Sequence, residues 1–249
     1  MLQVEIGTDE WLAATGGRLT PGQAAVLAAA GFAQLARERV SRSRGRAPSA
    51  SEQAGRLDVA RRELDGVLMT ERQHVVDRQG ETLLNHGCRT YLLGAILVPS
   101  EVFGRADHES SIVAALTHDD GLVHPTTPGG CFTADSADEA ARAMSRLGAG
   151  PEAIATARAA VISHFQPTLP PGASAEAYLV ARGASADVMG FGLRGVDPGV
   201  AREIWQQWPD QGFPRGVARL LKGERTRAPR TRPGVLSMSG MPYFLRSSR

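Results

Sequence analysis

The feature that most constrains this chain is a repeated succession of signals that start and end helices, with almost no strand pattern between them. Thr20-Pro21-Gly22-Gln23 combines an N-cap threonine, a proline in the first turn and a glutamine in the capping-box position. Asp197-Pro198 is a similar start, whereas Pro99 and Gly148 each follow a segment that they can end. This punctuation predicts an all-α fold.

The apolar residues between these signals repeat at helical spacing, as Leu57, Ala60, Leu64 and Val67 do. The first segment, residues 2–15, is compatible with a short strand or a packed arm, and a loop is expected over 41–51. We predict helices over residues 24–39, 51–76, 83–98, 107–121, 136–147, 151–164, 174–190, 197–208 and 213–222. The capping-box pair for the helix at 136–147 is Ser136 with Glu139.

Composition excludes several classes of protein. A length of 249 residues with 42% hydrophobic residues suits one large or two small globular domains and excludes a wholly disordered chain. The two cysteines, Cys88 and Cys131, are too few for a disulfide scaffold. No apolar run has the length of a membrane span, and the first residues do not resemble a secretory signal. We therefore expect a cytoplasmic protein with reduced thiols and no membrane partner.

The net charge of +2 is unevenly distributed along the chain. Residues 222–249 hold seven basic residues and one acidic residue, which leaves a charge of −4 on the rest. We expect this Pro/Arg-rich tail to be irregular, and to be solvated or docked on the domain rather than bound to nucleic acid. The predicted organisation is an N-terminal arm with helices over 1–80, a main domain over 81–221 and the tail over 222–249. The arm or the tail could also pack on a second copy, so a homo-oligomer stays open.

Four polar residues from three predicted helices are candidates for a metal site. His118 and Asp119 follow an apolar helix that runs into Gly121, where the end of the helix lets both side chains turn toward one ion. His86 lies on the preceding helix and Asp187 on a later one. Imidazoles and carboxylates that project from facing helices form a suitable ligand set for a divalent transition metal.

This ordered series resembles the HD-domain superfamily of metal-dependent hydrolases, whose signature is H…HD…D, over about half of the chain (residues 83–209). Within the superfamily it is most similar to the cyanamide-hydratase-like branch. The matching segments are Asn85-His86 before Arg89 and Tyr91, Glu109 and Ala115 ahead of Thr117-His118-Asp119-Asp120-Gly121-Leu122, then Phe132–Ala137, Val161–His164 and Asp187–Gly190.

The resemblance implies an all-α HD-domain helical bundle with an N-terminal helical extension, in which His86, His118, Asp119 and Asp187 bind one divalent metal. Zinc is the first expectation, with iron, manganese or nickel as alternatives. A metal-bound hydroxide would then attack a small, nitrogen-containing substrate of the cyanamide or nitrile type. The expected enzyme is a metal-dependent hydrolase or hydro-lyase acting on a small molecule.

Four further residues are candidates for catalysis beside the metal. His164 could act as an acid or base or contact the substrate, because histidine titrates near neutral pH, or it could simply be a helix-terminal histidine. Asp120 could orient a ligand or accept a proton, and His124 lies on a loop that could fold over the site. Arg89, three residues after His86, could face the same cavity or form an ordinary salt bridge.

Departures from the family keep other functions open. Asp120 and Thr117 replace residues that are usually apolar in the family, and Leu122 stands where many HD phosphohydrolases carry a lysine. Two-metal HD oxygenases need a further histidine near Thr133, so a single metal is preferred. The alternatives are a phosphohydrolase acting on a nucleotide or another phosphate ester, and a metal-free HD scaffold for binding or assembly.

Overall fold

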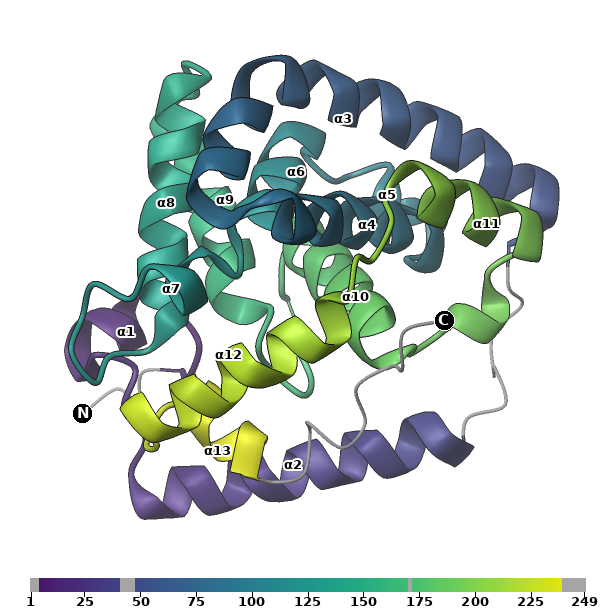
Figure 1. The fold of residues 1–249 in the computed structure, drawn as a ribbon. Helices are drawn as coiled ribbons and strands as arrows, with labels where there is room; N and C mark the ends of the chain where they lie inside the picture. Colours follow the sequence, from purple (N-terminus) through teal and green to yellow (C-terminus); the bar gives the residue numbers. More distant parts are fainter. Residues whose placement is uncertain (1–4, 41–47, 170–171, 239–249) are drawn as a thin grey trace.

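The computed structural model describes residues 5–40, 48–169 and 172–238, and this part of the chain is predominantly helical (Figure 1). These residues contain no strand, and extended backbone pairs only at an isolated bridge between Arg18 and Thr231. The all-α prediction is therefore confirmed. No helix of the described part is both long enough and apolar enough to cross a lipid bilayer.

The helices follow one another along the chain as Figure 1 labels them. Their bounds are α1 Asp9–Thr15, α2 Pro21–Val40, α3 Ala50–Gln79, α4 Glu81–Leu97, α5 Ser100–Phe103, α6 His108–Thr117, α7 Asp120–Val123, α8 Phe132–Arg146, α9 Pro151–Ser163, α10 Ala175–Met189, α11 Pro198–Gln207, α12 Phe213–Arg227 and α13 Arg232–Met238. A short 3-10 turn, Leu193–Gly195, joins α10 to α11.

Helix α4 is the centre of the bundle, and its residues from Leu83 to Ile96 are all buried. It packs most closely on α10, where a Cβ at Gly183 would overlap the carbonyl oxygen of Thr90. Helices α3, α6, α8 and α9 complete the bundle, and one apolar core joins α3 to the helices that follow it. The core therefore includes residues of α3 together with residues of the segment 81–221.

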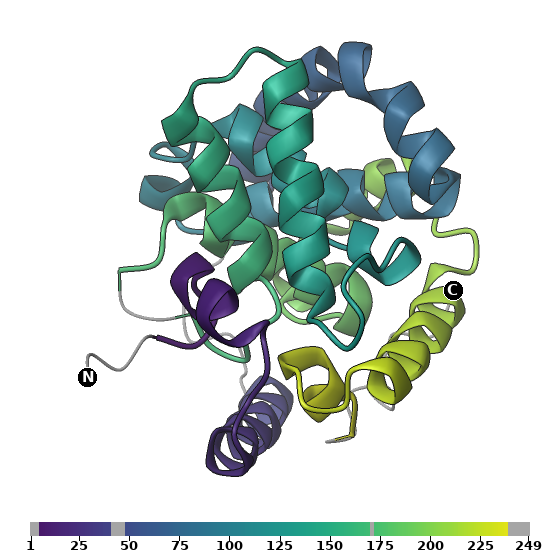
Figure 2. The same cartoon turned by 90° about the vertical axis from the view of Figure 1, so that its left-hand side faces the viewer.

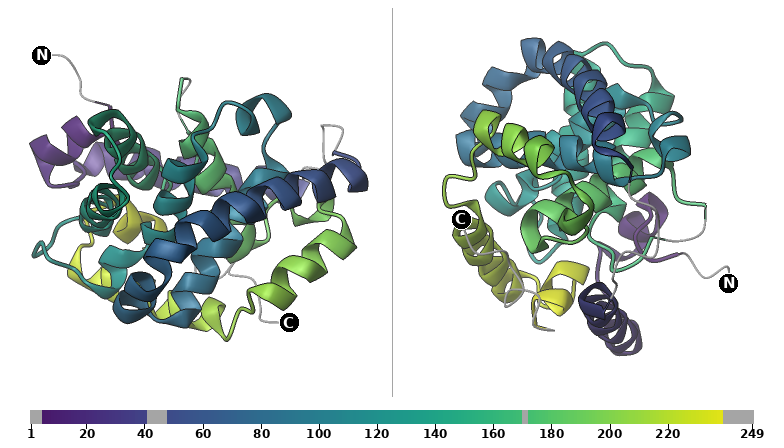
Figure 3. Two further views of the ribbon diagram at one scale, coloured as in Figure 1. Left: turned by 90° about the horizontal axis from the view of Figure 1, so that it is seen from above. Right: turned by 90° about the vertical axis from the view of Figure 1, so that its right-hand side faces the viewer.

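The two ends of the described chain meet beside this bundle. Figures 2 and 3 show α2 lying outside the other helices, with α13 against it and α12 alongside. The backbone amide of Leu19 donates to the carbonyl of Arg230 at 2.7 Å, which ties the start of α2 to the start of α13. Residues from both ends therefore form one outer layer next to α10.

Local capping signals account for several helix starts. The hydroxyl of Thr20 accepts from the amide of Gln23 at 3.3 Å, and the Gln23 side chain accepts from the Thr20 amide at 2.9 Å. Asp197 caps α11 through the amides of Gly199 and Val200. These starts were readable because each cap involves only residues close in sequence.

Two predictions about secondary structure, the helices over 136–147 and 107–121, had wrong bounds, and of the two alternatives for residues 2–15 the strand is excluded in the described residues. Helix α8 begins at Phe132 and not at Ser136, because the Ser136 hydroxyl is buried and accepts a hydrogen bond from the amide of Gly121. The short strand considered for the first segment is absent from its described part, which forms α1. The helix expected over 107–121 ends at Thr117, and α7 follows separately.

The irregular C-terminal tail is also a wrong prediction as far as the structure describes it. Helix α12 continues to Arg227, because Val217, Leu221 and Glu224 form one buried face. Helix α13 then buries Val235 and Leu236. The remainder of the predicted tail, residues 239–249, and most of the predicted loop, residues 41–47, lie outside the described residues.

Candidate metal centre

Three of the four predicted ligands converge in the interior of the bundle. His86 lies in the second turn of α4, and His118 and Asp119 lie in the bend between α6 and α7. One ligand atom of each residue lies within 4.8 Å of the others, and all three side chains are buried. This group could hold a metal ion.

The donor atoms form a triangle of suitable size. Nε2 of His86 lies 3.0 Å from Nε2 of His118, and each of these atoms lies 3.6 Å from Oδ2 of Asp119. A point equidistant from three atoms with these separations is about 2.0 Å from each of them, which matches the zinc–nitrogen and zinc–oxygen distances of protein sites. The separations of the donor atoms are therefore compatible with a small transition-metal ion.

The hydrogen bonds of the two rings decide which nitrogens are free. Nδ1 of His118 contacts the carbonyl oxygen of Ala115 at 2.7 Å, and Nδ1 of His86 contacts Oδ2 of Asp187 at 2.7 Å. Since both oxygens can only accept, both Nδ1 atoms carry a proton, and both Nε2 atoms face the cluster, where each could serve as a metal ligand. Metal-binding histidines are held in this way, with the second nitrogen donating to a carboxylate or carbonyl.

Burial controls the charge of the cluster. Burial lowers the pKa of His118, so its ring is neutral at neutral pH. Burial alone would raise the pKa of Asp119, but the adjacent His118, His86 and His164 outweigh it and hold that pKa below its usual value. Asp119 is therefore a carboxylate, and it contributes a negative charge to the cluster.

The fourth predicted ligand, Asp187, occupies a different place. Its Oδ1 accepts from Nε of Arg89 at 2.8 Å, and its Oδ2 accepts from Nη2 of Arg89 at 2.7 Å as well as from His86. Although burial would raise the pKa of Asp187, Arg89 and His86 hold it well below its ordinary value. The placement differs from direct metal ligation: Asp187 fixes the ring of His86 from the side away from the cluster.

Arg89 forms the salt bridge and does not line the cavity. Its guanidinium is fully buried, and Nη1 also donates to the carbonyl oxygens of Trp208 and Pro209 at 2.9 and 3.0 Å. Of the two interpretations of Arg89, the geometry therefore supports the salt bridge. Phe213 stacks on the ring of His86 with 4.0 Å between the centroids, so one face of that imidazole is covered.

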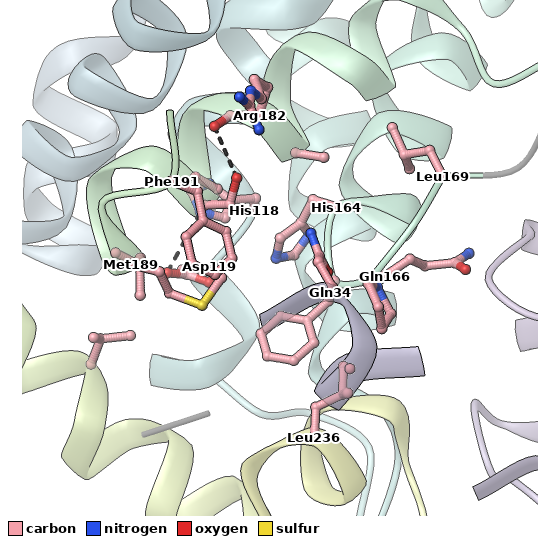
Figure 4. A pocket seen from close by; sticks show the side chains of 18 of the residues that line it. Gln34, His118, Asp119, His164, Gln166, Leu169, Arg182, Met189, Phe191 and Leu236 are labelled. Atoms are coloured by element: carbon pink, nitrogen blue, oxygen red, sulfur yellow. Dashed lines mark hydrogen bonds and ion pairs between the residues drawn. The ribbon is translucent and has the colours of Figure 1, made fainter. Parts of the chain in front are cut away.

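His164 lies beside the cluster. It follows the last residue of α9, and its ring is edge-on to that of His118 with 4.8 Å between the centroids (Figure 4). Nδ1 donates to the carbonyl oxygen of Val161 at 2.5 Å, which leaves Nε2 as an acceptor. Burial lowers the pKa of His164 to about 3, so this ring is neutral at neutral pH.

Asp120 and His124 lie apart from the cluster. Both carboxylate oxygens of Asp120 accept from Arg78, at 3.0 and 2.7 Å, and Nε2 of His124 donates to the carbonyl oxygen of Arg78 at 2.6 Å. Neither residue lines the cavity described below. Their predicted catalytic roles therefore have no support in this placement, because the bend after α6 directs Asp119 and Asp120 to different sides.

The cluster forms one end of a cavity of about 240 Å³. Helix α10 and the segment after α9 supply much of its wall, while α2, α12 and α13 cover it. Sequence reasoning missed the lining residues, since apolar side chains on a helix face look alike whether they border a cavity or fill a core. The missed residues include Gln34, Leu35, Phe165, Gln166, Leu169, Tyr178, Arg182, Ser185, Val188, Met189, Phe191, Val217, Leu221 and Leu236.

The fold and the site define an all-α protein with a buried His-His-Asp cluster that is compatible with a metal ion. No protein-family model and no curated protein matches the chain. The likeness to HD-domain hydrolases therefore depends on the ordered motif residues and on the convergence of His86, His118 and Asp119.

Proposed function

We propose that this chain is a metal-dependent hydrolase or hydratase of the HD type that acts on a neutral electrophilic carbon, such as that of a nitrile or cyanamide. One observation carries the proposal. Two imidazole nitrogens and one carboxylate oxygen face a common point at the end of a cavity that can admit a small molecule.

His86, His118 and Asp119 would hold the metal, zinc first and iron, manganese or nickel as alternatives. A bound divalent metal supplies a Lewis acid that polarises the substrate and makes water more acidic. Asp187 and Arg89 keep Nδ1 of His86 protonated and the ring in place. His164 offers its Nε2 lone pair to a water or substrate N–H in the cavity and so orients it.

The charges around the cavity favour a neutral substrate over a phosphate ester. Arg182 is the one arginine or lysine among the described lining residues, and it already pairs with Glu38 at 3.3 Å. Phosphate recognition uses several charge-assisted donors, often a bidentate arginine.

An activity panel tests the proposal. Protein loaded in turn with zinc, iron, manganese and nickel is assayed for hydration of cyanamide and simple nitriles, and for phosphate release from nucleotides. We expect hydration that His118→Ala abolishes and that His74→Ala retains, since His74 is a partly exposed residue paired with Glu139. Phosphate release without hydration would support the phosphohydrolase instead.

A third outcome separates the metal-free scaffold. Retention of no metal and no activity on either substrate class would leave a binding or assembly module as the interpretation. The cytoplasmic location and the absence of a nucleic-acid partner stay predictions from the sequence. Light scattering of the purified protein tests the homo-oligomer.

A further inference from the structure

We infer that the substrate is an uncharged molecule with an apolar body of several carbons attached to its reacting group; this inference rests on the proposed function. The size of the cavity is the first observation. Its volume of about 240 Å³ corresponds to about eight water molecules at roughly 30 Å³ each. Cyanamide itself has only three non-hydrogen atoms and would leave most of this space to water.

The distribution of polar atoms is the second observation. The hydrogen-bonding and charged groups His86, His118, Asp119 and His164 gather at one end of the cavity. Most of the remaining wall is apolar. It includes Leu35, Phe165, Leu169, Val188, Met189 and Phe191. Water in such a space finds few hydrogen-bond partners, so an apolar group displaces it favourably.

The polar groups away from the cluster do not supply a site for a charged substituent. Figure 4 shows Gln166 and Leu169 on the opposite side of the view from Asp119 and Met189. Gln34 and Gln166 are uncharged, and the Gln166 amide donates to the carbonyl of Ile6 at 2.9 Å. Arg182 is held by Glu38. Burying an ionised group here without a partner would be costly, so the body of the substrate is neutral.

The covering helices determine how long this body can be. Leu35 of α2, Val217 and Leu221 of α12, and Leu236 of α13 line the cavity, and these helices are not those that hold the polar cluster. On the wall, α10 presents the small side chain of Ala181. A larger residue at position 181 therefore takes up part of the cavity and leaves less room for the body of the substrate.

Binding of straight-chain nitriles, from acetonitrile to decanenitrile, tests the inference by calorimetry. With zinc-loaded protein we expect Kd to fall about fourfold for each added methylene that is buried. The gain should end after about six to eight carbons, when the cavity is full. The same dependence on length should persist in metal-free protein, because the apolar wall produces it. Carboxylates and amines of equal length should bind more weakly than the nitriles.

The variants are Ala181→Leu and, as a control on the same helix but away from the cavity lining, Ala175→Leu. Ala181→Leu should end the gain about two or three carbons earlier, and Ala175→Leu should behave as the parent protein. If Ala181→Leu does not fold, Leu221→Phe on α12 is the second cavity-filling variant. Affinity that is independent of length, or tighter binding of the charged analogues, would overturn the inference. Length-dependent binding without any hydration would instead refute the proposed reaction and leave the ligand class standing.

Discussion

Replacing Asp187 by asparagine tests whether this residue orients His86 or binds the metal itself. The substitution keeps the shape but removes the charge that Arg89 neutralises, and both side chains are fully buried. Removing one partner of a buried ion pair costs about 3–5 kcal/mol. Arg89 retains its bonds to the carbonyls of Trp208 and Pro209, so we expect a loss of about 3 kcal/mol, at the lower end of that range.

The new amide also affects the metal site. Its NH₂ group must face N–H donors of Arg89 or His86 across distances of 2.7–2.8 Å, so the fixed orientation of the His86 ring is lost. Loss of such an outer partner weakens metal binding by about 10- to 100-fold, whereas removal of a direct ligand, as in His118→Ala, should prevent binding.

Asp120→Asn is the matched control. Asp120 is equally buried and binds Arg78 through both oxygens, but it lies away from the cluster and Arg78 is partly exposed. We expect a loss of about 1 kcal/mol and unchanged metal affinity. Urea unfolding of metal-free protein gives the stabilities, and competition with a chromophoric chelator gives the affinities. Equal stability losses for both variants, or an Asp187→Asn protein with unchanged affinity, would refute the reasoning.

Three further predictions concern the rest of the fold. Burial lowers the pKa of His164 in the folded protein to about 3, so on acidification the unfolded chain binds a proton at this residue and the folded chain does not. The free energy of unfolding of metal-free protein, measured with urea, should therefore fall by about 2 kcal/mol between about pH 8 and pH 5. The His164→Asn protein should lose less over the same range. Gly183→Ala should destabilise the protein by about 3 kcal/mol or more, because its Cβ would overlap the Thr90 carbonyl. Gly223→Ala, with open space around the new Cβ, should stabilise the protein by about 0.5–1 kcal/mol. A Gly223→Ala protein that is less stable than the parent would contradict this account. Burial raises the pKa of the Cys88 thiol, so iodoacetamide should label Cys88 in unfolded but not in native protein, as mass spectrometry can show.

The helices were predictable where a signal is local. The pair Thr20 and Gln23 satisfies its own backbone, so the start of α2 can be read from four residues. Ser136 and Glu139 have the same pattern, yet tertiary contacts claim both side chains: Gly121 donates to Ser136, and Glu139 pairs with His74 and Arg78 of α3. A pattern of this kind fails when partners distant in sequence offer better bonds.

The site was predictable in its members but not in their arrangement. The motif identified His86, His118 and Asp119, which the structure brings together. Which carboxylate turns inward depends on the bend after α6, and which nitrogen of His86 is free depends on Asp187, 101 residues away. The cavity depends on helices from both ends of the chain, whose apolar residues carry no sign of what they cover.

The most direct test of the central claim is the metal content of purified protein after loading with zinc and removal of excess ion. We predict about one equivalent per chain, held through Nε2 of His86 and His118 and a carboxylate oxygen of Asp119. His118→Ala should retain none, and His74→Ala should retain the full amount. Absence of metal from the parent protein, or full retention by His118→Ala, would contradict the account.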